Sequence, residues 1–406
     1  MQSRIVVAGA GFAGVWSALS AKRLIGIQGK VDDIEVVVVA PEPSLVLRPR
    51  LYEADASGMT HPLGALFKDA GINFIRGTVE TIHTGEQTVN VRHVSGPAST
   101  IKYDRLILAV GSTVSRPSKV AGVQEHTFDI DALDSATKLE SHLQSLASLA
   151  ASPGRDTIVV CGGGFTGIEL ATELPKRFPN AHIVLVENGT EVASAFAPSS
   201  RDIIKRALQD LKVEVKLGSA VTSIDGEGIL LASGERIETK TPIWTAGVRA
   251  SPLTQQISGS KDGISRLHVN QNLCVPTDPH VFATGDAACA VADTNGHHAL
   301  MSCQHALVLG RFAGHNAAAD LLGEPMMPYS QAAYICCLDL GGHGAVIAQG
   351  WEKELKLQGD VAKGVKTLIN QQLIYPPHNV EEAMAAADPI GLDSDQLLEQ
   401  LVKVVG

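Results

Sequence analysis

The stretch from Asp156 to Glu187, DTIVVCGGGFTGIELATELPKRFPNAHIVLVE, constrains the fold of this chain more than any other. In order, it predicts a strand, a glycine turn, a helix, a second strand and a terminal acid. Its glycines Gly162, Gly164 and Gly167 have the spacing GxGxxG. At that spacing the first glycine permits a tight turn, the second lets a pyrophosphate approach the backbone, and the third lets the helix pack closely on the strand. The unpaired N–H groups at the start of the helix would then face the anion.

Glu187 ends the second strand of this unit, where a carboxylate can accept hydrogen bonds from a ribose 2′-hydroxyl. A 2′-phosphate would be repelled there, so the unit predicts a site for NAD(H) rather than NADP(H). The alternative is a glycine turn that binds nothing, because the glycine spacing by itself is a weak signal. The order of strand, helix, strand and acid favours the nucleotide site.

The same unit occurs a second time at the N-terminus. The segment RIVVAGAGFAG carries Gly9, Gly11 and Gly14 at the same spacing. Two such units in one chain of 406 residues predict two dinucleotides, one a resident flavin and the other a visiting nicotinamide. The fold class that follows is α/β, with two Rossmann-like dinucleotide-binding domains and a smaller C-terminal segment.

The expected domain organisation interleaves these two units. The strand at 103–112 (YDRLILAVGS) and the strand at 241–247 (TPIWTAG) both close at a glycine, Gly111 and Gly247. We expect an FAD-binding domain in two parts, residues 1–115 and 246–330, with the NAD-binding domain between them at 116–245. Residues 331–406 would form a C-terminal segment that covers the flavin.

The first unit departs from the usual pattern at the end of its second strand. Ala40 occupies the position where an acid would bind the ribose, and Glu42 follows two residues later. Glu42 either reaches the ribose from the loop or is a solvated loop residue.

Two arginines follow in the segment 43–57, which has neither helical nor strand periodicity. Arg48 and Arg50 flank a proline. They could contact the flavin pyrophosphate or the electron-rich edge of the flavin ring. The alternative is an ion pair between Arg50 and Glu53. Further along, Asp286 ends the segment VFATGD, and we expect it either to cap a following helix or to bind a flavin hydroxyl or phosphate.

Composition and charge limit the partners. The chain is 45% hydrophobic with 39 glycines, which suits a buried α/β core with tight loops. Its net charge of −10 argues against nucleic-acid binding and gives no attraction to anionic lipid. No apolar run reaches the ~18 residues of a membrane span, and the first strand begins too early for a signal peptide. The expected location is the cytoplasm, with at most peripheral membrane contact, and the oligomeric state is left open between monomer and homodimer.

Five segments carry a family resemblance over nearly the whole chain: GAGFAG, YDRLILAVGS, GGGFTGIE, IWTAGVRA and VFATGDAA, in that order. In order and spacing they resemble the flavoprotein reductases of the pyridine nucleotide–disulfide oxidoreductase superfamily, and among them the type II NADH dehydrogenases. The resemblance implies an NADH:acceptor oxidoreductase that passes a hydride from NADH to FAD and electrons onward to a quinone or another small acceptor. It implies FAD at Gly9, Gly11, Gly14, Gly111 and Asp286, NADH at Gly162, Gly164, Gly167 and Glu187, and Glu169 and Gly247 near the nicotinamide.

Two departures from this family bear on the acceptor. The family's flavin-side loop, Gln-Pro-Leu-Leu-Tyr, keeps its proline, second leucine and tyrosine here, but Arg48 and Arg50 differ. The family's quinone-helix pattern, Ala-Gln-x-Ala-x-Gln-Gln-Gly, falls on residues 303–310, where Gln304, Ala306 and Gly310 match and both later glutamines are apolar. Quinone is therefore the implied acceptor without being secured.

A helix expected at 300–322 would collect Met301, Gln304, His305 and Val308 on one face. By resemblance this face borders the acceptor site, with Gln304 as the retained polar group and, with Glu169, a candidate catalytic residue. The alternative is a helix that packs on the flavin domain with His305 satisfied locally.

The six cysteines decide between further activities. None forms a CxxC pair, so neither a metal site nor a disulfide framework is expected. Residues 15–160 contain no cysteine, which argues against disulfide reduction. Cys336 and Cys337 leave sulfide or persulfide oxidation as an alternative, although adjacent residues in a strand point to opposite faces. A redox-sensing flavoprotein that binds NADH with little turnover is the other alternative.

Overall fold

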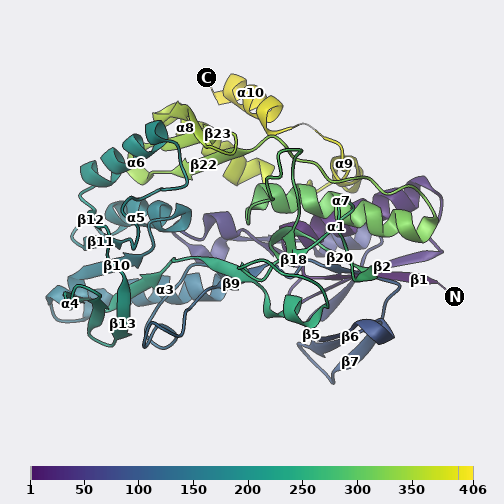
Figure 1. Ribbon diagram of the computed structural model, residues 1–406, viewed down its shortest axis with the longest axis horizontal. Helices are drawn as coiled ribbons and strands as arrows, with labels where there is room; N and C mark the ends of the chain where they lie inside the picture. Colours follow the sequence, from purple (N-terminus) through teal and green to yellow (C-terminus); the bar gives the residue numbers. More distant parts are fainter. Residues whose placement is uncertain (1, 392, 406) are drawn as a thin grey trace.

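The structure is a computed structural model that describes residues 2–391 and 393–405. It confirms the expected α/β architecture, because helices pack against two separate parallel-rich sheets (Figure 1). The larger sheet and the smaller one lie towards opposite ends of the long axis (Figure 1). One glycine-turn unit begins at β1 (Ser3–Ala8) of the larger sheet, and the other begins at β10 (Thr157–Cys161) of the smaller sheet.

The larger sheet has the strand order β19-β20-β8-β1-β2-β5-β6-β7. Its central strands are parallel and rich in valine and isoleucine, and they are buried because helices cover one face and loops and strands the other. An antiparallel hairpin of β6 and β7 ends the sheet at one edge. The strands are β1 (Ser3–Ala8), β2 (Ile34–Ala40), β5 (Asn73–His83), β6 (Thr88–His93), β7 (Ser99–Lys102), β8 (Arg105–Leu108), β19 (Cys274–Val275) and β20 (Asp278–Ala283).

Two helices from distant parts of the sequence lie side by side over this sheet, α1 (Phe12–Ile27) and α7 (Cys303–Leu322) (Figure 1). Glycines make the close approach feasible. A Cβ on Gly310 would lie 2.4 Å from the carbonyl oxygen of Ala13, and one on Gly314 would lie 2.0 Å from that of Ser17. Helix α7 therefore packs on helix α1 with the two backbones almost in contact.

The smaller sheet has the order β12-β11-β10-β16, all parallel. Helices α5 and α6 pack beside it, and a three-stranded antiparallel sheet lies next to it. The elements are α3 (Leu133–Ser145), α4 (Pro153–Asp156), β10 (Thr157–Cys161), α5 (Phe165–Arg177), β11 (His182–Val186), α6 (Pro198–Asp210), β12 (Glu214–Lys216), β13 (Val221–Asp225), β14 (Gly228–Leu231), β15 (Arg236–Glu238) and β16 (Thr241–Trp244).

The two connections between the sheets pair with each other. Strand β9 (Ser112–Val114) runs antiparallel to β17 (Val248–Ala250). The backbone N–H of Ser115 donates to the carbonyl of Gly247 at 3.0 Å, and that of Ser251 donates to the carbonyl of Gly111 at 3.0 Å. The glycines that close the two preceding strands therefore lie together at the junction.

The C-terminal part of the chain covers this junction from above in Figure 1. Its three-stranded antiparallel sheet packs on α5 and α8, and a π-helical turn at 369–373 continues α8. The elements are β22 (Ile335–Asp339), β23 (Ala345–Gln349), β24 (Glu354–Gln358), α8 (Gly359–Leu368), α9 (Val380–Ala386) and α10 (Ser394–Val405).

Three sequence expectations differ from the structure. The segment 43–57 contains a short strand, β3 (Ser44–Val46), which pairs with β4 (Thr60–Pro62), because a partner strand supplies hydrogen bonds that periodicity does not reveal. The helix expected from Leu300 begins at Cys303, where the Ser302 hydroxyl caps it. Asp286 lies in a single 3₁₀ turn followed by β21 (Ala288–Cys289), so it does not cap a following α-helix. The remaining short elements are α2 (Gly64–Asp69) and β18 (Leu267–His268).

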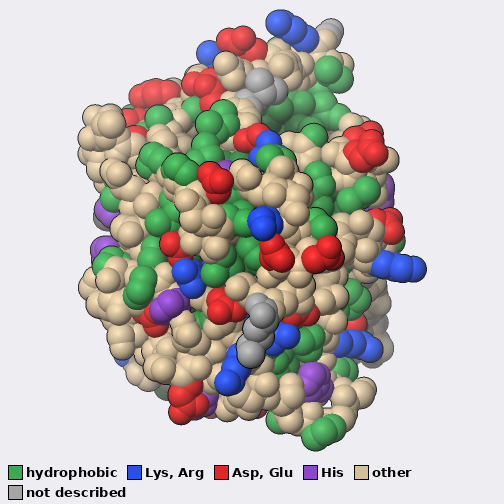
Figure 2. Space-filling view, turned by 90° about the vertical axis from the view of Figure 1, so that its right-hand side faces the viewer, with side chains coloured by type: hydrophobic (Ala, Val, Ile, Leu, Met, Phe, Trp, Pro, Cys, Tyr) green, Lys and Arg blue, Asp and Glu red, His purple; other side chains and the backbone are tan. Residues whose placement is uncertain are grey.

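The surface carries charges of both signs. On the face seen in Figure 2, acidic, basic and hydrophobic side chains are interspersed rather than sorted into one charged field. Among the residues that the structure describes, no helix is long and apolar enough to cross a membrane.

Candidate functional site

A cavity of about 1490 Å³ lies where the two sheets, the paired connections and the C-terminal segment meet. Eleven of the candidate site residues line it, although they come from elements far apart in the sequence. They are Gly11, Glu42, Arg48, Gly111, Gly162, Gly164, Glu169, Glu187, Gly247, Asp286 and Gln304. The other four candidates, Gly9, Gly14, Gly167 and Arg50, do not line it.

The first glycine turn has the shape that an anion needs. Gly9 has a φ of +111°, and a Cβ there would lie 2.4 Å from the carbonyl oxygen of Ala109. A Cβ on Gly14 would lie 2.0 Å from the carbonyl oxygen of Gly9, so the helix start packs tightly on the strand end. A Cβ on Gly11, by contrast, would meet nothing within 4 Å. Gly9 and Gly14 therefore shape the turn, while Gly11 leaves free the space that a pyrophosphate would fill.

The second turn repeats this arrangement. A Cβ on Gly167 would lie 1.9 Å from the carbonyl oxygen of Gly162, whereas one on Gly164 would meet nothing within 4 Å. Gly11 and Gly164 are also the N-caps of α1 and α5, and neither helix has a side-chain cap or an acid in its first turn. Both helix ends therefore present backbone N–H groups to the cavity, so the residues present fit two pyrophosphates.

Glu187 is held firmly at the edge of the second turn. One carboxylate oxygen accepts the N–H of Gly163 at 2.7 Å, and the other accepts the N–H of Gly189 at 2.6 Å. Carboxylate oxygens have further lone pairs, so the group can still accept a hydrogen bond from a ribose hydroxyl. Its fixed negative charge opposes a phosphate at the same place.

Glu42 lies at the outer rim of the cavity beside the first turn. It is exposed and forms an ion pair with Arg76, which lies within β5 beside Ala40 of β2. The ion pair neutralises part of its charge, while the carboxylate still faces the cavity.

A polar network surrounds Arg48 at the junction of the two connections. Its guanidinium forms an ion pair with Asp131 and lies 3.3 Å from Asp286. The Ser112 hydroxyl donates to the same Asp286 carboxylate at 2.7 Å. Burial raises the pKa of Asp131, and the facing Arg48 opposes that rise. Arg48 therefore ties the crossover to the loop of Asp286 in the cavity wall.

Arg50 points away from this network. It pairs with Glu53 at 2.8 Å and donates to the Tyr375 hydroxyl at 2.9 Å. The geometry favours the alternative interpretation of an Arg50–Glu53 ion pair, although that pair is half-buried rather than on the surface. A pair with Glu53 directs the guanidinium towards the C-terminal segment instead of the cavity.

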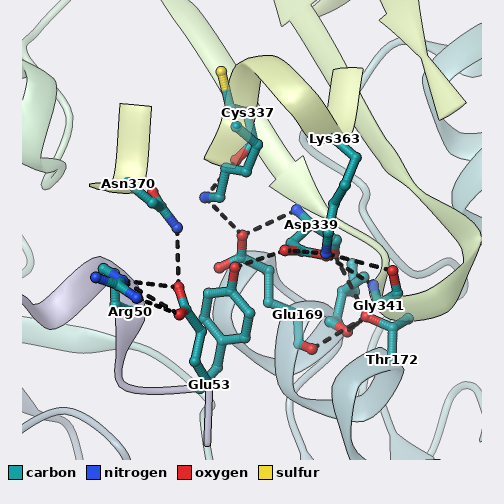
Figure 3. Close-up of polar contacts among 12 residues, drawn as sticks. Arg50, Glu53, Glu169, Thr172, Cys337, Asp339, Gly341, Lys363 and Asn370 are labelled. Carbon is teal, nitrogen blue, oxygen red and sulfur yellow. Dashed lines mark hydrogen bonds and ion pairs between the residues drawn. The ribbon is translucent and has the colours of Figure 1, made fainter. Parts of the chain in front are cut away.

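Glu169, labelled in Figure 3, lies on the cavity wall. It forms a buried ion pair with Lys366 of α8 at 3.0 Å. Each of the two residues is at most 5% exposed. Lys366 also donates to the carbonyl of Cys337 at 2.9 Å. Burial raises the pKa of Glu169 to about 7, with Lys366 opposing the rise. Burial alone would lower the pKa of Lys366, but Glu169 raises it overall, so the lysine keeps its proton and Glu169 is the group that titrates near neutral pH.

Asp339 connects this pair to the surrounding network (Figure 3). Its backbone N–H donates to Glu169 at 3.0 Å, and its carboxylate accepts from the Tyr52 hydroxyl at 2.9 Å. Lys363 contacts both carboxylate oxygens at 2.5 and 2.6 Å. Glu169 lies on α5 and is therefore held in place by residues of α8 and β22. The sequence pattern indicated only the helix that carries Glu169.

Gln304 lies in the first turn of α7 and faces the same cavity. Its side-chain oxygen accepts the N–H of Ile335 at 3.3 Å. Met301 lines the cavity too, but His305 is fully buried, with its Nδ1 2.9 Å from the Ser302 hydroxyl and its ring beside Tyr334. Of the four residues expected on one face, Met301 and Gln304 therefore line the cavity, whereas His305 is buried and Val308 packs against the hydrophobic core.

Sequence reasoning missed the partners of Glu169. Lys366 had one usable signal, because it lies on the apolar stripe of its helix between the buried Ala362 and Val365 positions and Ile369. A lysine at such a position is almost never buried without a partner. Asp339 had no such signal.

The chain matches known proteins over most of its length. The family described as pyridine nucleotide-disulphide oxidoreductase matches residues 3–310. An NADH dehydrogenase-like protein of Mycobacterium tuberculosis is 39% identical over 95% of this chain and 98% of the relative. A demethylphylloquinone reductase of Synechocystis is 27% identical, covering 92% of this chain and 91% of the relative. The solved structure of NDH2 from Plasmodium falciparum in complex with NADH has a TM-score of 0.76 at 15% identity and covers 95% of this chain and 97% of that one.

Proposed function

This chain belongs to the pyridine nucleotide-disulphide oxidoreductase family, and on that premise we propose that it is an FAD-dependent NADH dehydrogenase that passes electrons to a quinone-like acceptor. The observation that carries the proposal is the single cavity of about 1490 Å³, which runs from both glycine turns to Glu169 and Gln304. Its lining therefore joins the two expected dinucleotide sites to the two candidate catalytic side chains. The names of the mycobacterial and cyanobacterial relatives support the same reaction class.

In this proposal the first glycine turn holds FAD and the second holds NADH. When bound, FAD would itself accept a hydride from NADH and release electrons to an acceptor. Gly11, Gly111 and Asp286 line the FAD side together with Arg48 and Glu42. Gly164, Gly247 and Glu187 line the NADH side. The chain's main task is to hold the two nucleotides in fixed relative positions while the C-terminal segment excludes water.

The resemblance places Glu169 near the nicotinamide, but Glu169 lines the same cavity as Gln304. We therefore assign both polar groups to the acceptor. Reduction of a quinone consumes protons, and a carboxyl group with a pKa near 7 is suited to deliver one at neutral pH. Lys366 keeps Glu169 oriented and partly compensates its charge after the proton has left. Gln304 can donate a hydrogen bond from its amide nitrogen, because only its oxygen is used by Ile335.

The test separates the two half-reactions by anaerobic stopped-flow. Gln304→Leu should slow flavin reoxidation by a small quinone by about 10-fold or more, corresponding to one lost hydrogen bond of ~1.4 kcal/mol. Flavin reduction by NADH should stay nearly unchanged. Slower reduction with normal reoxidation would place the acceptor on the wrong side of the cavity. Negligible turnover with every acceptor, together with a stable NADH complex, would instead favour the redox-sensing alternative.

Sulfide or persulfide oxidation is the weaker alternative. Cys336 and Cys337 both line the cavity, so two thiols lie where such a reaction would need them. However, burial raises the pKa of each thiol to about 12, so neither is a ready thiolate nucleophile. Rapid NADH-independent flavin reduction by sulfide would overturn this preference.

A further inference from the structure

A cluster of His268, Cys289 and His298 lies outside the cavity and has no role in the proposed reaction. One side-chain ligand atom from each residue lies within 4.8 Å of the others. A tetrahedral zinc ion with bonds of about 2.3 Å to sulfur and 2.0–2.1 Å to nitrogen holds its ligands about 3.5 Å apart. The three side chains therefore need to close by only about 1 Å to share one ion, which rotation of the exposed His298 can supply.

The backbone holds these residues in register. His268 in β18 is the direct partner of Cys289 in the parallel β18–β21 pair. His298 is fixed by a bridge to Val291, two residues beyond Cys289, and the next residue, Ala299, donates its N–H to Ala290 at 2.9 Å. Strand pairing and a β-bridge thus hold two imidazoles and a thiol at one place. Cation binding would therefore not require a long loop to become ordered.

Access and charge also suit a cation. Cys289 is only 4% exposed, His268 is half-buried and His298 is exposed, so the cluster opens outwards to solvent and leaves a coordination position for water. In the hydrogen-bond network of residues 2–391 and 393–405, neither imidazole makes a side-chain hydrogen bond. The nearby Arg266 brings a positive charge, but its ion pair with Asp262 at 2.7 Å compensates it.

We propose that His268, Cys289 and His298 form a site for a zinc-class divalent cation, with water as the fourth ligand. Two neutral imidazoles and one thiolate are a ligand set that zinc prefers, whereas magnesium and calcium prefer oxygen. The site was invisible in the sequence because its single cysteine belongs to no CxxC pair and its ligands come from three separate segments.

Binding of a cation at this site would affect the cavity through the short backbone segment that follows His298. Leu300 and Met301 follow His298 by two and three residues, and both line the cavity before α7 begins. A cation that joins His298 to β18 and β21 would fix the hairpin at 291–299 and, with it, this part of the cavity wall. The inference does not depend on which acceptor the enzyme uses.

The test uses the FAD-loaded protein titrated with zinc alone. Isothermal titration should show one site tighter than any other surface site, and X-ray absorption at the zinc edge should show one sulfur at about 2.3 Å with nitrogen ligands at about 2.0–2.1 Å. Cys289→Ser and His298→Ala should each weaken that site by about 100-fold or more. The matched controls are Cys274→Ser, a buried thiol in β19 of the larger sheet, and His83→Ala, an exposed histidine, and both should bind zinc as the parent does.

Two results would overturn the proposal. One is a zinc shell without sulfur, and the other is zinc affinity that Cys289→Ser and His298→Ala leave unchanged. Because His298 is exposed, its variant should fold normally even where the buried cysteine variant does not. Hydrogen exchange then tests the link to the cavity, since zinc should protect amides of 291–302 in the parent and not in His298→Ala. Unchanged exchange in the parent would refute that link.

Discussion

At the scale of single residues, Glu187 and Glu169 show how the same functional group does different work in different surroundings. Glu187 is half-exposed, and two backbone N–H groups hold its charge at the nucleotide edge. Glu169 is buried, where desolvation raises its pKa to about 7 even beside Lys366. The first residue is suited to select a ligand by charge, and the second to exchange a proton.

We predict that Glu187→Arg reverses the cofactor preference. The parent enzyme should prefer NADH, because the carboxylate repels a 2′-phosphate. The arginine would attract that phosphate, so the ratio of kcat/KM for NADPH to that for NADH should rise about 10- to 100-fold, or ~1.4–2.7 kcal/mol. Steady-state kinetics with both nucleotides measures this ratio. Equal use of the two nucleotides by the parent would contradict the assignment of Glu187.

We also predict that the acceptor half-reaction depends on the protonation of Glu169. Its protonated fraction falls as pH rises through about 7, so flavin reoxidation by a quinone should slow above that pH. Glu169→Gln cannot deliver a proton and should be about 10²-fold slower or worse, with this pH dependence lost. The pH profile of reoxidation, with NADH reduction as an internal control, checks this. A variant that retained the parent's profile would remove Glu169 from the proton step.

At the scale of elements, the contact between α1 and α7 joins the two ends of the FAD-side unit. Helices usually meet through side chains at axial distances of about 8–10 Å. Here Gly310 and Gly314 bring backbone atoms of α7 against Ala13 and Ser17. The same crossing sets the start of α7, and thus Gln304, at the cavity.

We predict that Gly314→Val weakens this contact by about 1–3 kcal/mol, as expected for overpacking in a tight interior. The matched control is Gly26→Ala in α1, where a new Cβ meets nothing within 4 Å. That control should be neutral or stabilising, because alanine favours the helix by up to about 1 kcal/mol. Thermal unfolding followed by flavin fluorescence measures both variants. Equal stability of the two would show that the helices can separate without cost.

At the scale of the whole molecule, the two glycine turns serve one cavity from different sheets. Their shared geometry indicates that each can be blocked separately. Gly11 and Gly164 both face open space, so a larger side chain at either position fills the nucleotide site without a clash within the fold.

We predict opposite losses from the two corresponding substitutions. Gly11→Glu should give a folded protein without FAD, because its carboxylate occupies and repels the pyrophosphate position. Gly164→Glu should retain FAD but lose reduction by NADH. Absorbance spectra and circular dichroism of the purified variants, followed by NADH titration, distinguish the two cases. Full FAD content in Gly11→Glu would refute the assignment of the N-terminal turn.

Local sequence was sufficient wherever the interaction is local. The two strand–turn–helix units, the two strands that each end at a glycine and the α/β class follow from spacing and hydrophobic pattern, because a GxGxxG turn and its helix are completed within one short segment. Position along the chain also indicated Glu187, since it ends the strand next to the turn.

Tertiary structure alone decided which of the remaining side chains meet. Lys366 and Asp339 reach Glu169 only because the C-terminal sheet and α8 pack on α5. Arg50 turns to Glu53 while Arg48 joins Asp131 and Asp286, although both arginines flank the same proline. His268, Cys289 and His298 come together through strand register. Spacing in sequence cannot encode such contacts, because a buried charge or polar group costs free energy unless it meets a partner, and these partners are distant in the chain.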